Sequence, residues 1–253
     1  MPHQRAANMH IDALIERVKA ILIEPNTEWL TIADEHITPS DLYRNYVAIL
    51  AAIPAVFGFV KGSFIGIDVP MIGTMRTGAG AGFAAMFVDY ALTLAQVYLI
   101  ALAVNALAPT FGGRKDPLQA LKLAAYAYTA SWVAGFGLIV PWLGMPIAIA
   151  GIAYSIYLLY LGLPVLTKCP REQTGSFTLV MIVVAAVLGL VPSHIVGTIT
   201  AGESPNRIDR TDIDYTKDST IGALDERSHA IDAAMKQAEA ARRAGESAPP
   251  TEH

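Results

Sequence analysis

An uncharged stretch at residues 123–167 limits what this 253-residue chain can fold into. Its 45 residues include no Asp, Glu, Lys or Arg. As one helix the stretch would be about 67 Å long at ~1.5 Å per residue, whereas the hydrocarbon core of a bilayer is about 30 Å thick. Pro141, Gly144 and Pro146 interrupt its middle, where a tight turn between two helices is expected. The stretch therefore predicts a transmembrane helical hairpin.

The composition agrees with a membrane protein and excludes several other classes. Hydrophobic residues make up 53% of the chain and charged residues 16%, whereas globular proteins contain about 25% charged residues. The net charge of −4 and the absence of a basic stripe argue against a nucleic-acid partner. Because Cys169 is the single cysteine, no internal disulfide can form. The first 30 residues lack the apolar core of a signal peptide, so we expect insertion through the spans themselves.

Hydropathy predicts five membrane-spanning helices, at about residues 44–64, 80–107, 118–140, 143–166 and 177–200. The expected fold is all-α: a polytopic membrane protein with a five-helix transmembrane bundle at 44–200. We expect an N-terminal amphipathic region at 1–43 and a polar, mobile tail at 201–253, with a helix near 221–243.

The flanks of the spans predict the orientation of the chain. An odd number of crossings places the two ends of the chain on opposite sides. The flanks on the N-terminal side carry nine Lys and Arg residues and the opposite flanks carry five. Positive residues favour the cytoplasmic side, so the N-terminus is expected in the cytoplasm and the C-terminus across the membrane.

The N-terminal region contains an amphipathic helix. Apolar residues recur at helical spacing, at Ile11, Leu14, Ile15, Val18, Ile21 and Leu22. Pro25 marks the end of this helix. The stripe fits either of two places: the membrane interface, or a surface of the protein's own bundle. Trp29 follows and is expected to anchor at headgroup level.

Glycines on the first two spans predict close contact between helices. Gly58, Gly62 and Gly66 are spaced four apart, and Gly78 and Gly82 begin the second span among other small residues. Faces made of small residues let helix backbones approach each other within a membrane. We expect these faces to pack helices of the bundle or a second copy of the chain.

The order of several short motifs resembles that of the Yip family (Ypt-interacting proteins), in its bacterial form, over about residues 11–200. The residues that carry the resemblance are Pro25, Trp29, Asp41, Leu42, Tyr43, Leu163, Pro164, Lys168 and Pro170. The resemblance implies an all-helical membrane domain, a cytoplasmic N-terminus and a role in membrane organisation or trafficking. We therefore expect residence in a bacterial inner membrane.

Two polar residues inside the predicted spans are candidates for function. Asp89 is the stronger candidate, because burying a carboxylate within a span costs free energy and such a residue by default suggests an ion or proton site. Alternatively, it faces water near the interface or accepts hydrogen bonds from Tyr and Trp side chains. His194 lies beside Pro192, which frees a backbone carbonyl that Ser193 or His194 can satisfy locally. A single histidine without a second ligand is not a metal site, so no metal and no cofactor is expected.

The motifs of common enzymes are missing. The sequence has no phosphate-binding loop, no Gly-x-Ser-x-Gly elbow and no His-Glu-x-x-His pair. The favoured hypothesis is a non-enzymatic membrane scaffold whose partners are lipids and either further copies of the chain or other membrane proteins. The alternative is a small transporter or channel that uses Asp89 as its intramembrane site.

Overall fold

The computed structural model describes residues 2–69, 73–140 and 142–202, together with 227, 229, 231 and 233–237. The chain divides into two units, Met1–Glu203 and Ser204–His253. In the second unit, the described residues are helical and exposed. They fall within the helix expected at 221–243, whose other residues lie outside the described part.

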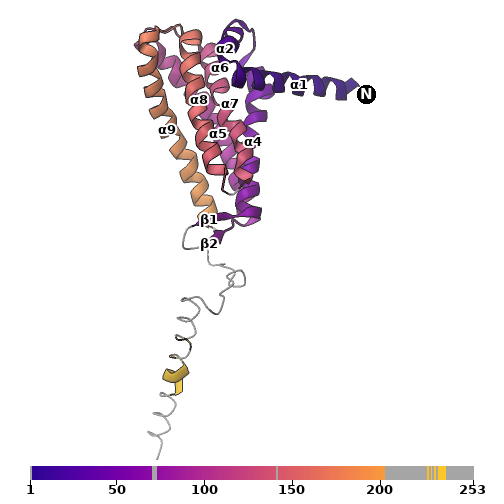
Figure 1. Ribbon diagram of the computed structural model, residues 1–253, viewed down its shortest axis with the longest axis vertical. Coiled ribbons are helices and arrows are strands. Elements are labelled where there is room, and N and C mark those ends of the chain that lie inside the picture. The colour runs from indigo at the N-terminus through magenta and orange to yellow at the C-terminus, as the bar shows by residue number, and fades with distance from the viewer. Residues whose placement is uncertain are drawn as a thin grey trace, which may run out of the picture. The chain divides into compact units, whose positions relative to one another are not determined.

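The first unit is a bundle of helices with one short strand hairpin (Figure 1). Its α-helices are α1 Pro2–Ile23, α2 Pro25–Asp34, α3 Pro39–Leu42, α4 Ala48–Val60, α5 Ala79–Leu107, α6 Pro117–Ala127, α7 Thr129–Ala134, α8 Gly144–Thr167 and α9 Arg171–Gly202. Two π-helical turns (Tyr43–Val47 and Lys61–Ile65) and two 3₁₀ turns (Ala108–Phe111 and Gly135–Ile139) extend them. Strands β1 (Ile67–Val69) and β2 (Gly73–Met75) pair antiparallel, with Ile67 opposite Met75.

Four helical segments of the described chain are long and apolar enough to cross a membrane: Pro39–Ile65, Ala79–Phe111, Gly144–Thr167 and Arg171–Ile199. The prediction of an all-α fold with several membrane-spanning helices is confirmed to that extent. The structure differs over the third expected span, 118–140, which is not one helix. That segment is divided into α6, α7 and a 3₁₀ turn.

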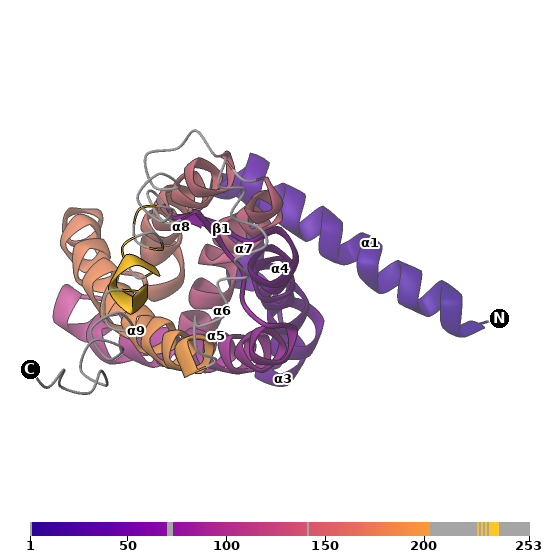
Figure 2. The same cartoon turned by 90° about the horizontal axis from the view of Figure 1, so that it is seen from below.

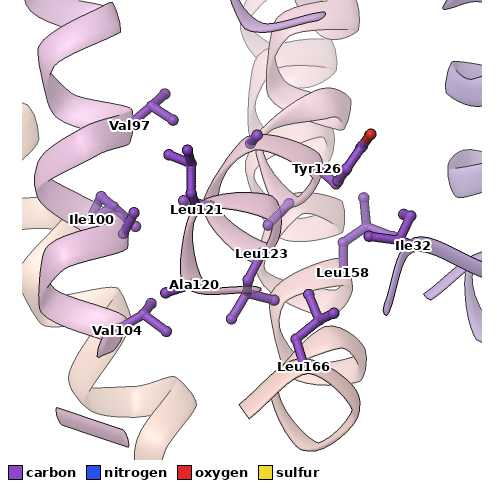
Figure 3. Packing of buried hydrophobic residues seen from close by; sticks show 14 of the residues in the cluster. Ile32, Val97, Ile100, Val104, Ala120, Leu121, Leu123, Tyr126, Leu158 and Leu166 are labelled. Carbon is purple, nitrogen blue, oxygen red and sulfur yellow. The ribbon is translucent and has the colours of Figure 1, made fainter. Parts of the chain in front are cut away.

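The helices α6 and α7 of the divided segment lie inside the bundle. All residues from Ala120 to Ala127 are buried, because α6 packs against α5 on one side and α8 on the other. Figure 3 shows Leu121 on the side of Val97 and Ile100, whereas Leu123 lies toward Leu158. Because protein surrounds α6, the side chains of Ala120–Ala127 contact other helices and not lipid.

Glycine backbones explain why the divided segment ends in a tight turn. A Cβ atom at Gly135 would lie 3.0 Å from the Cα of Pro54. A Cβ atom at Gly137 would lie 2.6 Å from Cγ2 of Ile147. The 3₁₀ turn thus fits between α4 and α8 only because these positions carry no side chain. The chain then turns before α8 begins at Gly144, where the sequence predicted a break.

Helix α1 leaves the bundle sideways (Figures 1 and 2). It begins at Pro2, earlier than the stripe from Ile11 indicated, and ends at Ile23 before Pro25 opens α2. Ile21 is fully buried, whereas Ile11 is 52% and Ile15 50% exposed. The two alternatives for the stripe therefore apply to different residues: Leu14, Val18, Ile21 and Leu22 pack on the protein, whereas Ile11 and Ile15 are exposed.

Helix α9 begins earlier than the sequence indicated. The last span was expected from residue 177, but the helix starts at Arg171 and the link after α8 is only residues 168–170. Lys168 adopts a left-handed conformation with φ +57°, which ends α8 abruptly. Arg171 and Glu172, which lie before the expected span, thus belong to the first turn of α9.

Candidate functional site

The buried ammonium group of Lys122 joins α6 to the end of α2. Its Nζ donates hydrogen bonds to the carbonyl oxygens of Ile32, at 2.7 Å, and Glu35, at 2.6 Å. Because α2 ends at Asp34, carbonyls of its last turn lack partners within the helix. A cation at this end also complements the helix dipole. Lys122 therefore caps α2.

Arg17 fastens α1 to the same place. Its guanidinium pairs with Glu28 of α2 and, at 3.0 Å, with Glu35, and it lies 5.9 Å from the ring centroid of Tyr126. Burial by itself would lower the pKa of Arg17. The Tyr126, Glu35 and Glu28 side chains raise it, and the net shift of the pKa is upward. The guanidinium thus stays charged and holds three helices together.

Trp29, expected at the headgroup level, is instead fully buried. Its ring packs edge to face on Tyr126, with centroids 6.4 Å apart and planes at 87°. A Cβ atom at Gly162 of α8 would lie 2.8 Å from the Trp29 ring. The prediction that Trp29 lies at the headgroup level was wrong. The residues that enclose its ring, Tyr126 and Gly162, are far from it in the sequence, and the local sequence around Trp29 does not indicate them. The missed signal is Gly162, which leaves space for the ring.

The first membrane-spanning segment, Pro39–Ile65, begins with the motif residues Asp41, Leu42 and Tyr43, which also attach it to α5. Thr38 is the N-cap: its hydroxyl accepts a hydrogen bond from the backbone N–H of Asp41 and donates to the Asp41 carboxylate at 2.6 Å. Leu42 is fully buried. The hydroxyl of Tyr43 donates to the carbonyl oxygen of Leu94 at 3.1 Å. These motif residues therefore have structural roles in this chain.

The motif residues near the end of α8 form a second junction. Leu163 is fully buried, and Pro164 lies inside the helix. The carbonyl oxygen of Thr167 accepts a hydrogen bond of 2.7 Å from the backbone N–H of Arg114. Pro170 lies against Gly112, where a Cβ atom would be 3.2 Å from its Cδ. Lys168 is exposed, as is one face of Pro170.

The intramembrane candidates do not meet each other. Asp89 is half-buried in the first half of α5, and across the described residues it has no hydrogen bond or ion pair. His194 is exposed on α9. In the part of the chain that the structure describes, no three His, Cys, Asp or Glu side chains gather as a metal site would need. Cys169 is buried, with its sulfur 3.5 Å from the hydroxyl of Thr174.

The structure distinguishes among the glycines of the first two spans. A Cβ atom at Gly82 would lie 2.3 Å from Oγ of Ser63 and 3.2 Å from the ring of Phe59 in α4, so α4 and α5 approach closely there. A Cβ at Gly62 would have an ordinary contact of 3.8 Å, and at Gly58 it would meet no atom within 4 Å. Gly66 lies beyond the helix, with φ +92°, and Gly78 is the exposed N-cap of α5.

Another glycine makes a tighter contact that the sequence did not single out. A Cβ atom at Gly151 of α8 would lie 2.4 Å from the Cβ of Ala134 and 3.1 Å from the carbonyl oxygen of Ala130. Both are rigid parts of α7. The sequence does not single out Gly151, because no glycines spaced four apart accompany it. Its close neighbours are residues of the short helix α7.

These contacts make an interlocked bundle with a projecting helix and no paired nucleophile and base among the described residues. The sequence pattern of the Yip1 domain matches residues 19–192. Two curated relatives, from Escherichia coli strain K12 and Escherichia coli O6:H1 strain CFT073, both carry the name inner membrane protein YohC. Each is 25% identical over 166 residues, which is 65% of this chain and 85% of the relative. No solved structure matches the chain.

Proposed function

Because the chain belongs to the Yip1 domain family of integral membrane proteins, we propose that it serves as a non-enzymatic scaffold of the bacterial inner membrane. Its bundle holds a projecting apolar surface at the edge of the bilayer, and that surface recruits lipid or other membrane proteins. The inner-membrane location rests on the name of the E. coli relatives.

The observation that carries the proposal is the divided stripe of α1. Ile21 is buried in the bundle, and Val18 is partly buried against it. The same stripe continues to Ile15 and Ile11, which are about half exposed. Helix α1 itself leaves the bundle (Figure 2). Arg17 and its carboxylate partners hold the helix in this position. An apolar stripe held beside a membrane bundle suits a bilayer surface or a partner helix.

The topology that we propose has five crossings, with the N-terminus in the cytoplasm. The divided segment from Pro117 to Ile139 has 23 residues. A straight α-helix of that length would extend about 35 Å at ~1.5 Å per residue, which exceeds a ~30 Å hydrocarbon core. Its two ends support this reading. Before the segment, the backbone N–H of Arg114 donates to the carbonyl oxygen of Thr167 at the end of α8. After the segment, Gly144 at the start of α8 lies beside Lys61 of the spanning segment Pro39–Ile65.

The scaffold role is tested by mild crosslinking in the native membrane, purification, and mass spectrometry of the proteins retained. The variant Ile11→Ser with Ile15→Ser should lose reproducible partners, because it removes the exposed apolar stripe and leaves Arg17 in place. The matched control, Asp12→Ser with Glu16→Ser, changes two exposed residues on the charged face and should keep them. Equal losses in both variants would contradict the proposal, and a protein that purifies alone would exclude protein partners of this surface.

A second candidate, a transporter or channel, is favoured by one observation. Asp89 is a half-buried carboxylate within a spanning helix, without a bonded partner among the described residues. Liposomes containing the protein would then show proton- or substrate-dependent flux that Asp89→Asn abolishes. Asp41→Asn, at an exposed helix cap, is the control. Flux that survives Asp89→Asn would exclude Asp89 from this role.

A further inference from the structure

A cavity of about 320 Å³ lies between α5, α6, α7, α8 and α9. It reaches the outer surface of the bundle, because Ile152 of α8 and Ala186 of α9 line it and are exposed. Its inner wall includes Ala124 and Met181, both fully buried. The cavity is therefore a side pocket that opens between α8 and α9.

The position of the cavity along the helices places it near the middle of the bilayer. On α8 it is lined at 152–159, in the middle of Gly144–Thr167. On α9 it is lined at 181–186, in the middle of Arg171–Ile199. The opening therefore faces the hydrocarbon chains of lipid and lies far from the headgroups.

The polar groups of the cavity wall bond to one another. The hydroxyls of Ser131 and Ser155 lie 2.8 Å apart, and the backbone N–H of Ser131 donates to the Ser155 hydroxyl at 3.0 Å. The side-chain amide of Gln96 donates to the hydroxyl of Tyr128 at 3.5 Å. With these groups paired, the remaining wall is mainly hydrocarbon from Ile, Leu, Met and Ala side chains.

Three occupants can be compared on physical grounds. A buried water molecule needs about two to four hydrogen-bond partners, and the polar groups of this wall are already bonded to one another. An empty space would forfeit the dispersion contacts of its lining. A helix of a second copy is about 10 Å across with its side chains and is too bulky for this cavity. A slender hydrocarbon chain meets none of these objections.

We propose that this cavity binds one acyl chain of a bilayer phospholipid, which enters between α8 and α9 while its headgroup stays at the interface. The site depends on residence in a bilayer and goes beyond the scaffold role. The bound chain fills the space between α9 and the interior helices and so becomes part of the packed bundle.

The test uses the full-length protein in liposomes made with a phospholipid that carries a diazirine at the middle of one acyl chain. After irradiation, labelled peptides are mapped by mass spectrometry. The lining residues Ser155, Ile156, Ile182 and Ala185 should be labelled severalfold more than outward-facing residues at the same depth, such as Ala153 and Val187. Equal labelling of the cavity and the outward face would overturn the proposal.

Variants that fill the cavity provide the second measurement. Ala185→Phe adds a ring from α9 and should reduce cavity labelling severalfold, whereas Ala153→Phe, on the outward face of α8, should leave it unchanged. If Ala185→Phe does not fold, Ala186→Phe at the exposed mouth replaces it. Unchanged labelling in the filled variant would overturn the proposal. So would labelling by a free fatty acid carrying the same group but not by the phospholipid.

Discussion

The contact between Gly151 and Ala134 predicts that one added methyl group forces α7 and α8 apart. In Gly151→Ala the new Cβ would lie 2.4 Å from the Cβ of Ala134, whereas carbon atoms in contact prefer ~3.5–4.0 Å. The two helices would have to separate by more than about 1 Å. Neither atom can rotate away, because both are attached directly to a helix backbone.

The expected energy follows from two opposing terms. Replacing glycine by alanine inside a helix favours the helix by about 1 kcal/mol. Overpacking a core costs about 1–3 kcal/mol. The control Gly58→Ala gains the first term without the second, since its Cβ would meet no atom within 4 Å. The two variants should therefore differ in the free energy of unfolding by about 1–3 kcal/mol, with Gly151→Ala the less stable.

The assay is reversible unfolding in mixed micelles with increasing SDS, followed by circular dichroism. The double variant Gly151→Ala with Ala134→Gly removes the opposing methyl group and should recover much of the loss, which a double-mutant cycle measures. If Gly151→Ala is as stable as Gly58→Ala, α7 and α8 do not pack as described and the reasoning is refuted.

Three further predictions concern the junctions and the topology. Lys122→Met should lower the free energy of unfolding by about 2–4 kcal/mol, since it leaves two carbonyls without donors; in the same SDS titration, Lys168→Met, at an exposed residue, should have little effect. Tyr46→Phe removes the 2.7 Å hydrogen bond to Thr129 and should cost about 0.5–1.5 kcal/mol, and an unchanged unfolding midpoint would show that this bond adds nothing. In a Cys169→Ser background, a cysteine at Lys168 should react with an impermeant maleimide only from the cytoplasmic side, and reaction from the outer side alone would reverse the proposed orientation.

Much of the fold could be predicted from the sequence because hydropathy is a local property. Long apolar runs identify α5, α8, α9 and the spanning segment Pro39–Ile65, and each run can be recognised without knowing which helices pack against it. Pro25 ends α1 for an equally local reason: it lacks a backbone N–H and fixes φ. The family was also readable, since its short motifs keep their order along the chain.

The candidate site depended on contacts between residues far apart in the sequence. Trp29 looks like an interfacial tryptophan until Tyr126 and Gly162 enclose it. Lys122 looks like a residue near a span end until the carbonyls of Ile32 and Glu35 accept its hydrogen bonds. Neither pairing leaves a spacing pattern that a sequence reader could find.

The sequence by itself thus determined that the chain is a helical membrane protein and where most of its long helices lie, because lipid selects apolar runs one segment at a time. The tertiary structure decided which segment occupies the interior, which glycines permit close contact, and where a side cavity opens. Those features depend on distances between helices, and helices approach each other only where small side chains on one meet the right shape on the other. Gly58 and Gly151 carry the same side chain, yet only Gly151 faces a neighbouring helix closely enough to need it.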